Sequence, residues 1–223
     1  DAGLGDFTIL LINGDVNLQS GSWTHLVNKT GQFYRLNVRV GGDMAIGPAA
    51  AIDVAALGYS QLCLDGGVAK TSANEGGSYG ARAGVNGTRA VDPYGCYYAP
   101  EEPGSGGTGG QDGRGGGAVK LTVAGTLTHN GVINANGSRN NWGHYIPSGG
   151  SIWIIAGAIE GTGTLLSRSQ NQNYSGSGGR IAVILTGKGA DFSAYDLVHL
   201  ANASTMQADA PYSGGPGTIY AET

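Results

Sequence analysis

The stretch GGAVKLTVAGTLTHNGVINANGS (Gly116–Ser138) decides the fold, because its opening phrase returns further along the chain. GGSIWIIAGAIEGTGTLLSRS follows from Gly149, GGRIAVIL from Gly178 and the degenerate GPGTIYAET from Gly215. These starts are separated by 33, 29 and 37 residues, a spacing at which self-similarity indicates stacked repeat units. A diverged version without the glycine pair, YRLNVRVGGDMAIGPAAAIDVAALG, precedes them from Tyr34.

Apolar residues alternate with other residues inside each unit, as in Val119, Leu121 and Val123. This period of two predicts strands with one buried face, and no unit shows helical spacing. A short strand cannot bury its own apolar face, so each unit needs a neighbour stacked upon it. We therefore predict an all-β chain with one domain over residues 1–223, a single-stranded parallel β-helix (solenoid). The alternative is an antiparallel β-sandwich or jelly roll.

The composition agrees with a folded, glycine-rich protein. Glycine supplies 43 of the 223 residues, and charged residues are only 13%. The apolar share of 40% is too high for a disordered chain. A net charge of −4 gives no electrostatic footprint for nucleic acid, and no apolar run is long enough to predict a membrane span.

Two regions depart from the repeat. Residues 1–33 are expected to form an irregular N-terminal cap, and Asn13-Gly14 within them could equally form a hairpin turn. Residues 59–117 are expected to form a long glycine-rich surface excursion. Four tyrosines could pin this excursion to the solenoid wall: Tyr79, Tyr94, Tyr97 and Tyr98.

Cys63 and Cys96 either form a disulfide or are two buried thiols, since their spacing fits no metal or redox motif. We favour the disulfide, which would close a loop with little core of its own and would indicate an oxidising, extracellular setting. Sequons would permit N-glycosylation in such a setting. They lie at Asn28, Asn86, Asn136, Asn173 and Asn202.

The order of the motifs SYGARAG, GGGAVKLTVAGTLTHNGVINANG, SGGSIWI, GTGTL, SGGRIAV and GGPGTIY resembles the glycine-rich repeat segments of large secreted or surface parallel β-helix proteins. Such proteins occur in bacteria and also in plants and protists. The resemblance covers residues 34–60 and 76–221. It implies a β-helical, extracellular or cell-surface architecture and no established activity.

Enzyme motifs are missing from the sequence. No GxSxG elbow, phosphate loop or HxxxH spacing is present. His129, beside the Asn130-Gly131 turn, is expected to be solvated. Carboxylate pairs of the kind that glycosidases need would arise only if folding brings suitable residues together. The candidates are Glu101 with Glu102, Asp191 with Asp196, and Asp43 with Asp53. We therefore predict a non-catalytic protein, with a polysaccharide lyase or hydrolase as one alternative.

No cofactor is expected. Calcium is a lesser alternative, because Gly109-Gly110-Gln111-Asp112-Gly113 approaches a calcium-binding nonapeptide without a second copy. A second oxygen-rich group consists of Asn13, Asp15 and Asn17.

One constellation follows from stacking. If the glycine pairs are in register, Lys120, Trp153, Ala182 and Tyr220 occupy equivalent outward positions, because each lies between two inward apolar residues. An exposed indole and phenol beside cationic groups form a surface on which sugar rings could stack. The alternative is that an excursion carrying Tyr145 or Tyr174 covers Trp153. The candidate glycan-binding residues are Trp153, Lys120, Tyr220, Arg180, Trp142 and Tyr145.

The sequence thus predicts an extracellular structural or adhesive β-helix that self-assembles into a filament or surface layer. The alternative to this role is a glycan-binding adhesin module, including a phage or cell-surface fibre tip. The expected partners are further copies of the chain or a surface polysaccharide.

Overall fold

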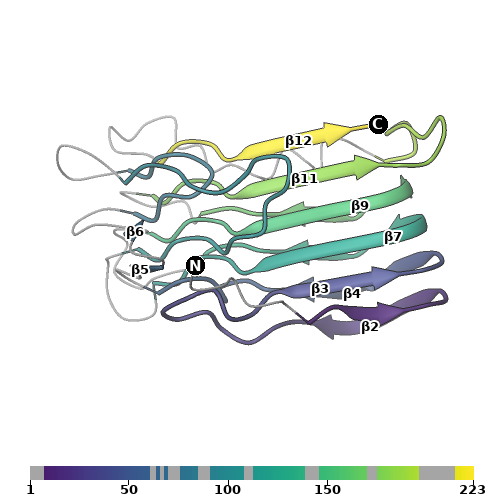
Figure 1. Ribbon diagram of the computed structural model, residues 1–223, viewed down its shortest axis with the longest axis horizontal. Coiled ribbons are helices and arrows are strands. Elements are labelled where there is room, and N and C mark those ends of the chain that lie inside the picture. The colour runs from purple at the N-terminus through teal and green to yellow at the C-terminus, as the bar shows by residue number, and fades with distance from the viewer. Residues whose placement is uncertain are drawn as a thin grey trace.

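The computed structural model describes residues 8–60, 64–65, 68–69, 76–84, 91–107, 113–138, 146–169, 175–195 and 214–223. These residues form strands and turns and no helix, which confirms the all-β prediction (Figure 1). The strands are β1 (Leu10–Ile12), β2 (Val16–Trp23), β3 (Leu36–Val40), β4 (Met44–Asp53), β5 (Leu64–Asp65), β6 (Val68–Ala69), β7 (Ala118–His129), β8 (Val132–Asn134), β9 (Ser151–Glu160), β10 (Thr164–Leu166), β11 (Arg180–Leu185) and β12 (Thr218–Glu222).

Ten of these strands belong to one curled sheet in which every described pairing is parallel. Only the short β5–β6 pair is antiparallel. The parallel pairing excludes an antiparallel sandwich for this sheet. It also excludes a hairpin at Asn13-Gly14, because β1 pairs with β3 and β2 pairs with β4.

The first ladder of the sheet contains β1, β3, β7, β9, β11 and β12, in that order. Val119 lies opposite Ile152, which lies opposite Ile181, which lies opposite Ile219. The repeats beginning at the glycine pairs therefore stack in the predicted register. Figure 1 shows the labelled strands of this ladder running in the same direction, one above the next.

The sheet curls because two strands bend and continue into a second ladder. The register between β7 and β9 shifts between Val123 and Thr126, after which Leu127 lies opposite Ile159. The first residues of β4 pair with this second half of β7, and its last residues pair with β8. Strand β10 then extends β8 to form a third ladder.

The concave side of the sheet holds the core. Columns of β-branched and aliphatic side chains line it, one from each strand, and the central ones are fully buried. Complete burial of one such side chain contributes roughly 1.5–3 kcal/mol. One column runs through Val38, Leu121, Ile154 and Val183. The alternation of apolar residues in the sequence therefore predicts correctly which side chains of these strands face the core.

Polar side chains at the turns join one layer to the next. In each case a carboxylate or amide oxygen accepts a hydrogen bond from a backbone N–H of the following layer. The pairs are Asp15 with the N–H of Asp43 (2.8 Å), Asp43 with Thr126 (2.7 Å), Asn130 with Thr162 (3.1 Å) and Asn136 with Arg168 (2.7 Å). These bonds satisfy backbone donors that leave the ladders at the turns.

The glycine pairs precede the strands and form their own layer of backbone contacts. The N–H of Gly149 donates to Ser177 (3.1 Å) and that of Gly178 to Gly215 (3.1 Å). A Cβ at Gly150 would lie only 2.0 Å from the carbonyl oxygen of Gly117. Only glycine permits backbones to approach this closely.

The predicted surface excursion is packed into this glycine layer where it is described. Tyr59 donates its N–H to Gly104 (3.0 Å), and Gly80 donates to Gly178 (3.2 Å). Tyr79 is fully buried. Residues 76–79, 83–84 and 103–105 are buried and form an inner layer, because glycines allow their backbones to pair with the later repeats, whereas Arg82 between them is exposed. Strands β1 and β2, expected within an irregular cap, likewise pair in parallel with β3 and β4 and continue the ladders, with one shift of register between Leu18 and Ser20.

Candidate functional site

The predicted outward column exists. Lys120 on β7 lies opposite Trp153 on β9, Trp153 lies opposite Ala182 on β11, and Ala182 lies opposite Tyr220 on β12. The register derived from the glycine pairs therefore brings these residues together on one face. Their surroundings decide whether that face is open to a ligand.

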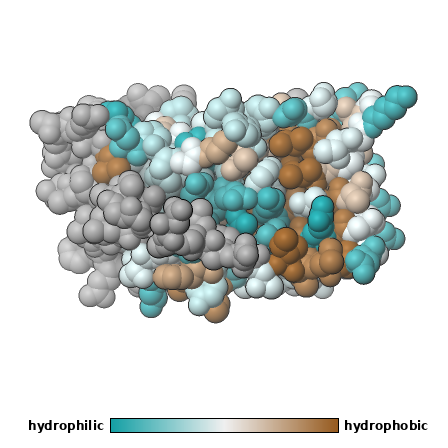
Figure 2. Space-filling model, viewed as in Figure 1, coloured by the Kyte–Doolittle hydropathy of each residue, from teal (hydrophilic) through white to brown (hydrophobic). Residues whose placement is uncertain are grey.

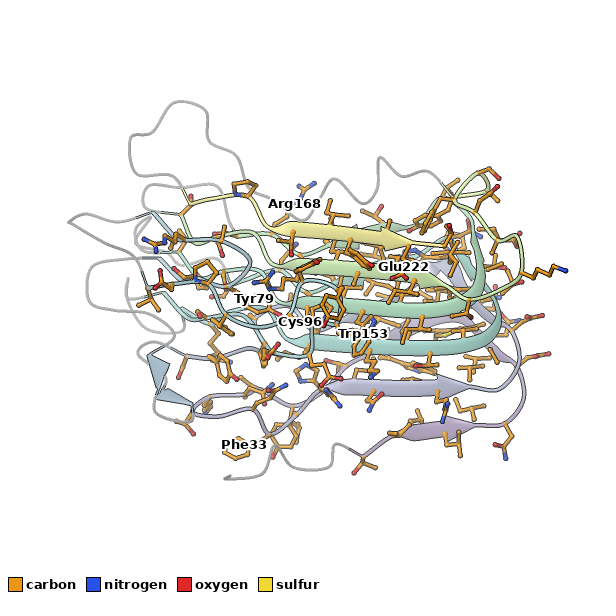
Figure 3. The ribbon with its side chains drawn as sticks, turned by 45° about the horizontal axis from the view of Figure 1, so that its top comes forward. Phe33, Tyr79, Cys96, Trp153, Arg168 and Glu222 are labelled. Carbon is orange, nitrogen blue, oxygen red and sulfur yellow. The ribbon has the colours of Figure 1, made fainter. Side chains whose placement is uncertain are left out.

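Residues 94–102 lie over this column. The Oγ of Ser151 donates to the carbonyl of Glu102 (2.6 Å), and the Glu101 carboxylate contacts Lys120. Trp153 is half-buried, and its Nε1 is enclosed with no hydrogen-bond partner among the described residues. Cys96, in this segment, lies close to Tyr79 (Figure 3). A segment of the glycine-rich excursion thus covers the indole. The sequence suggested Tyr145 or Tyr174 for this covering role, and both lie outside the described residues.

The cationic groups of the column are occupied by protein partners. Lys120 Nζ lies 3.1 Å from one oxygen of Glu101, and Arg35 Nη1 lies 3.0 Å from the other. Partial burial acts to raise the pKa of Glu101, but the hydrogen bonds and charges of Arg35 and Lys120 outweigh it and hold that pKa below its usual value. Glu101 is therefore ionised at neutral pH and forms an ion pair with each of the two cations, one at each of its oxygens.

Arg180 holds the excursion in place. Its side chain is only 6% exposed. The guanidinium donates to the carbonyl of Tyr94 from Nη2 (2.8 Å) and Nε (3.2 Å), and to Thr218 Oγ1 from Nη1 (3.1 Å). A further bond reaches the carbonyl of Tyr79 (3.3 Å). Arg180 thus lies in the predicted column region but acts as a clamp between the sheet and the segment over it.

Tyr79 and Tyr94 form the buried base of the segment. Their ring centroids are 4.7 Å apart. The Tyr79 hydroxyl pairs with Ser151 Oγ (2.5 Å), and the Tyr94 hydroxyl donates to the carbonyl of Pro103 (2.7 Å). Burial, assisted by the charge of Glu102, raises the pKa of Tyr79 above its usual value, so its hydroxyl stays protonated. These two tyrosines pin the excursion as the sequence predicts.

Three other tyrosines, the exposed Tyr97 and Tyr98 and the half-buried Tyr220, lie together at the surface and are named here the tyrosine cluster. The Tyr97 and Tyr98 rings meet edge to face with centroids 5.2 Å apart, and the Tyr220 ring lies 5.7 Å from Tyr97 and 6.2 Å from Tyr98. Tyr97 is 53% exposed and Tyr98 is 51% exposed. The hydroxyl of Tyr220 donates to Glu222 (2.6 Å), a bond that raises the pKa of Tyr220.

Of the cluster, sequence reasoning placed only Tyr220 at a binding surface. Tyr97 and Tyr98 were expected to anchor the excursion, yet half of each side chain faces solvent. The adjacent tyrosines at positions 97 and 98, shortly after Gly95, are the sequence feature from which an exposed aromatic site could have been predicted. Gly95 has a φ of +74°, a conformation that favours glycine, and this turn carries Tyr97 and Tyr98 to the end of the sheet beside β12.

Several predicted residues cannot be placed at a site. Trp142 and Tyr145 lie outside the described residues, as do Asn86, Asn173, Asn202 and Asp112. Cys63 also lies outside them, so the disulfide remains a prediction; its expected partner, Cys96, is a half-buried thiol in the structure.

The sequon asparagines that are described already serve the fold. Asn28 is buried, its Nδ2 donates to the carbonyls of Tyr34 (2.7 Å) and Leu57 (3.3 Å), and its Oδ1 accepts the N–H groups of Phe33 and Tyr34. A glycan would need the same amide nitrogen, so this geometry argues against glycosylation of Asn28. Asn136 uses its Oδ1 in the turn bond to Arg168.

Metal and carboxylate sites find little support where the structure is described. No group of three or more His, Cys, Asp or Glu side chains suited to a metal ion occurs among the described residues. Asp15 accepts the N–H of Asp43, and Asn17 accepts a bond from Gln19. The length of β4 separates Asp43 from Asp53, so these two do not form a catalytic pair. Asp196, the expected partner of Asp191, lies outside the described residues.

His129 differs from expectation. Its side chain is fully buried, and its Nδ1 lies 2.8 Å from the hydroxyl of Tyr195, with the two rings stacked. The segment that follows β11 thus closes over the turn after β7, which the local sequence around His129 does not reveal.

The described part of the chain contains no helix that is long and apolar enough to cross a membrane. Comparisons of this chain with protein-family models, with curated proteins and with solved structures found no match.

Proposed function

We propose that this chain is a parallel β-helix that serves as an extracellular structural element and that joins other copies of itself end to end. The in-register ladders support the β-helical interpretation, since successive repeats contribute strands to more than one ladder and return through short turns. The extracellular setting and the lack of catalysis rest on the resemblance of the glycine-rich motifs and on the predicted Cys63–Cys96 disulfide.

The open ends of the core carry this proposal. Side chains in the inward columns are fully buried in the central strands, as Leu121 is at 0% exposure. At the two ends of the first ladder, no described strand covers the inward-facing side chains of β1 and β12 on their outer side. Leu10 on β1 is 49% exposed and Ile219 on β12 is 42% exposed. A further coil at either end would bury them.

The direction of the strands specifies how copies would join. Strand β1 lies at one end of the first ladder and β12 at the other, and both run parallel to their neighbours. Within the described residues each pairs on one side only. Placing β12 of one copy beside β1 of the next would continue the ladder in the same direction. Such a head-to-tail contact does not close on itself and produces a filament.

Edge-strand variants test the proposal. Leu10→Lys and Ile219→Lys place a charge at the two open ends, where a solvated lysine opposes strand addition. The control Ala124→Lys adds the same charge at an exposed position of the central strand β7. Light scattering and electron microscopy over a range of protein concentrations should show filaments for the native chain and for Ala124→Lys, and shorter or no filaments for the end variants. Monomers at every concentration of the native chain would overturn the proposal.

A further inference from the structure

We propose that the tyrosine cluster is a binding site for a neutral or amino sugar, held by stacking of the sugar ring on the exposed phenol rings. This inference adds a ligand to the proposed extracellular role and rests on that role only for its biological setting. It also moves the predicted glycan site: Trp153, Lys120 and Arg180 are engaged within the protein, whereas Tyr220 joins two tyrosines that are open to solvent.

The cluster is held by a rigid base. The segment carrying Tyr97 and Tyr98 is clamped before them by Arg180 at the carbonyl of Tyr94, and after them by the bonds of Glu101 to Lys120 and Arg35. Tyr220 projects from β12, which pairs in register with β11. Rings that are already in place lose little conformational entropy on binding, which favours affinity.

The exposed chemistry of the cluster suits a sugar. Each phenol offers an apolar ring face together with a hydroxyl that donates and accepts hydrogen bonds. The hydroxyl of Tyr220 is aligned by Glu222, whose exposed carboxylate can accept bonds from sugar hydroxyls or an ammonium. A purely apolar partner would leave these polar groups without partners, at a cost in binding free energy.

The charges around the cluster indicate the class of sugar. The cations nearest in the ladder, Lys120 and Arg180, are bound to Glu101 and to backbone carbonyls. The charged group that accompanies the cluster is the carboxylate of Glu222. A uronic acid would meet the Glu222 carboxylate directly, while Lys120 and Arg180 direct hydrogen bonds to protein acceptors, so neutral and amino sugars are favoured over uronic acids.

Oligosaccharide binding by the full chain tests this inference. The probes are soluble gluco- and manno-oligosaccharides, chitosan oligomers and oligogalacturonates, measured by calorimetry. We expect binding to a neutral or amino oligomer and weaker or no binding to oligogalacturonate. Tyr97→Ala and Tyr98→Ala should each weaken binding about two- to tenfold, the range that one aromatic contact provides. For a neutral oligomer, affinity should change less than about twofold on raising the salt concentration, because no charge pair would be screened.

The control variant is Phe33→Ala. Phe33 is 64% exposed and, in Figure 3, lies well away from Cys96, which directly precedes the tyrosine pair. Its removal should leave affinity unchanged. Failure of the native chain to bind any neutral or amino oligomer, or unchanged affinity in both tyrosine variants, would overturn the inference. Filament formation measured on the same samples separates this outcome from failure of the proposed structural role, and Leu10→Lys on β1, at the other end of the ladder from the cluster, changes the filament contact without touching the cluster.

Discussion

Lys120 Nζ lies 3.7 Å from the centre of the Trp153 ring, while the Glu101 carboxylate binds the same ammonium group at 3.1 Å. The parallel register of β7 and β9 brings the lysine and the indole together, and the glycine-rich segment supplies the carboxylate. This contact joins the sheet to the segment that carries the tyrosine cluster. The face seen in Figure 2 is mixed in character, with hydrophilic side chains across the middle of the view and apolar ones toward the right.

The first prediction concerns this contact. Lys120→Met keeps an unbranched side chain over Trp153 but removes the charge that pairs with Glu101. We expect the unfolding free energy to fall by about 0.5–1 kcal/mol, the contribution of a partly exposed ion pair or cation–π contact. Quenching of tryptophan fluorescence by acrylamide should also increase as the covering segment loosens. The matched variant Lys29→Met, at an exposed lysine, should change neither measurement; equal effects in the two variants would contradict the role given to Lys120.

The second prediction concerns the glycine layer. Gly150→Ala would place a Cβ 2.0 Å from the carbonyl oxygen of Gly117, which lies in the backbone of the preceding repeat. Because neither backbone can move without breaking ladder bonds, we expect a loss of about 3 kcal/mol or more in unfolding free energy. Gly14→Ala is the control, since a Cβ there meets nothing within 4 Å. Urea unfolding measures both, and a Gly150→Ala protein as stable as Gly14→Ala would show that the repeats do not approach this closely.

The third prediction concerns the polar turns. Asp43→Ala removes the oxygen that accepts the N–H of Thr126 at 2.7 Å and should lower stability by about 1 kcal/mol. Asp43→Asn keeps an acceptor in the same place, so its unfolding midpoint should lie close to that of the native chain. If the asparagine variant is as unstable as the alanine variant, the hydrogen bond to Thr126 is not what stabilises the turn.

The fourth prediction concerns pH. His25 Nδ1 lies 2.6 Å from the carbonyl of Leu26, and its Nε2 accepts the N–H of Ala118 at 3.2 Å, an arrangement that requires the neutral ring. Burial lowers the pKa of His25 below 6.5, although the bond to Leu26 acts in the opposite direction. The unfolded chain therefore binds a proton more readily than the folded one, and His25 destabilises the fold as the pH falls through 6.5 toward the lowered pKa.

His25→Gln tests that linkage. We expect the native chain to lose stability between pH 7.5 and pH 5 more steeply than the glutamine variant, which has no ring to protonate. Urea midpoints at several pH values within this range give the comparison. Parallel pH profiles for the two proteins would mean that His25 does not titrate with folding.

The register of the repeats could be predicted from the sequence, because two independent signals agree there. The glycine pairs at Gly149 and Gly178 set the start of each strand, and the alternation around Ile152 and Ile181 sets its buried face. A shift of one residue would turn every apolar side chain outward. The columns of the core and the column through Lys120 and Trp153 follow from that register alone.

The covering of that column could not be predicted in the same way. Glu101 meets Arg35 and Lys120, and Arg180 meets the carbonyl of Tyr94, across separations in sequence that no local pattern encodes. Low-complexity glycine segments carry no periodicity from which their packing could be inferred. The exposure of the tyrosine cluster depends on this packing, so sequence reasoning placed the glycan site on residues that the fold uses internally.

Cysteine cross-linking of paired positions tests the stacking of the repeats most directly. Thr122 on β7 lies opposite Ile155 on β9, and both side chains are half-buried on the outer face. In a chain with Cys63→Ser and Cys96→Ser, Thr122→Cys combined with Ile155→Cys should form a disulfide readily, since paired Cα atoms of neighbouring strands are about 4.8 Å apart. Lys120→Cys combined with Ile155→Cys, offset by two residues and about 8 Å apart, should not. Efficient cross-linking of the offset pair with none in the paired positions would contradict the parallel, in-register stack.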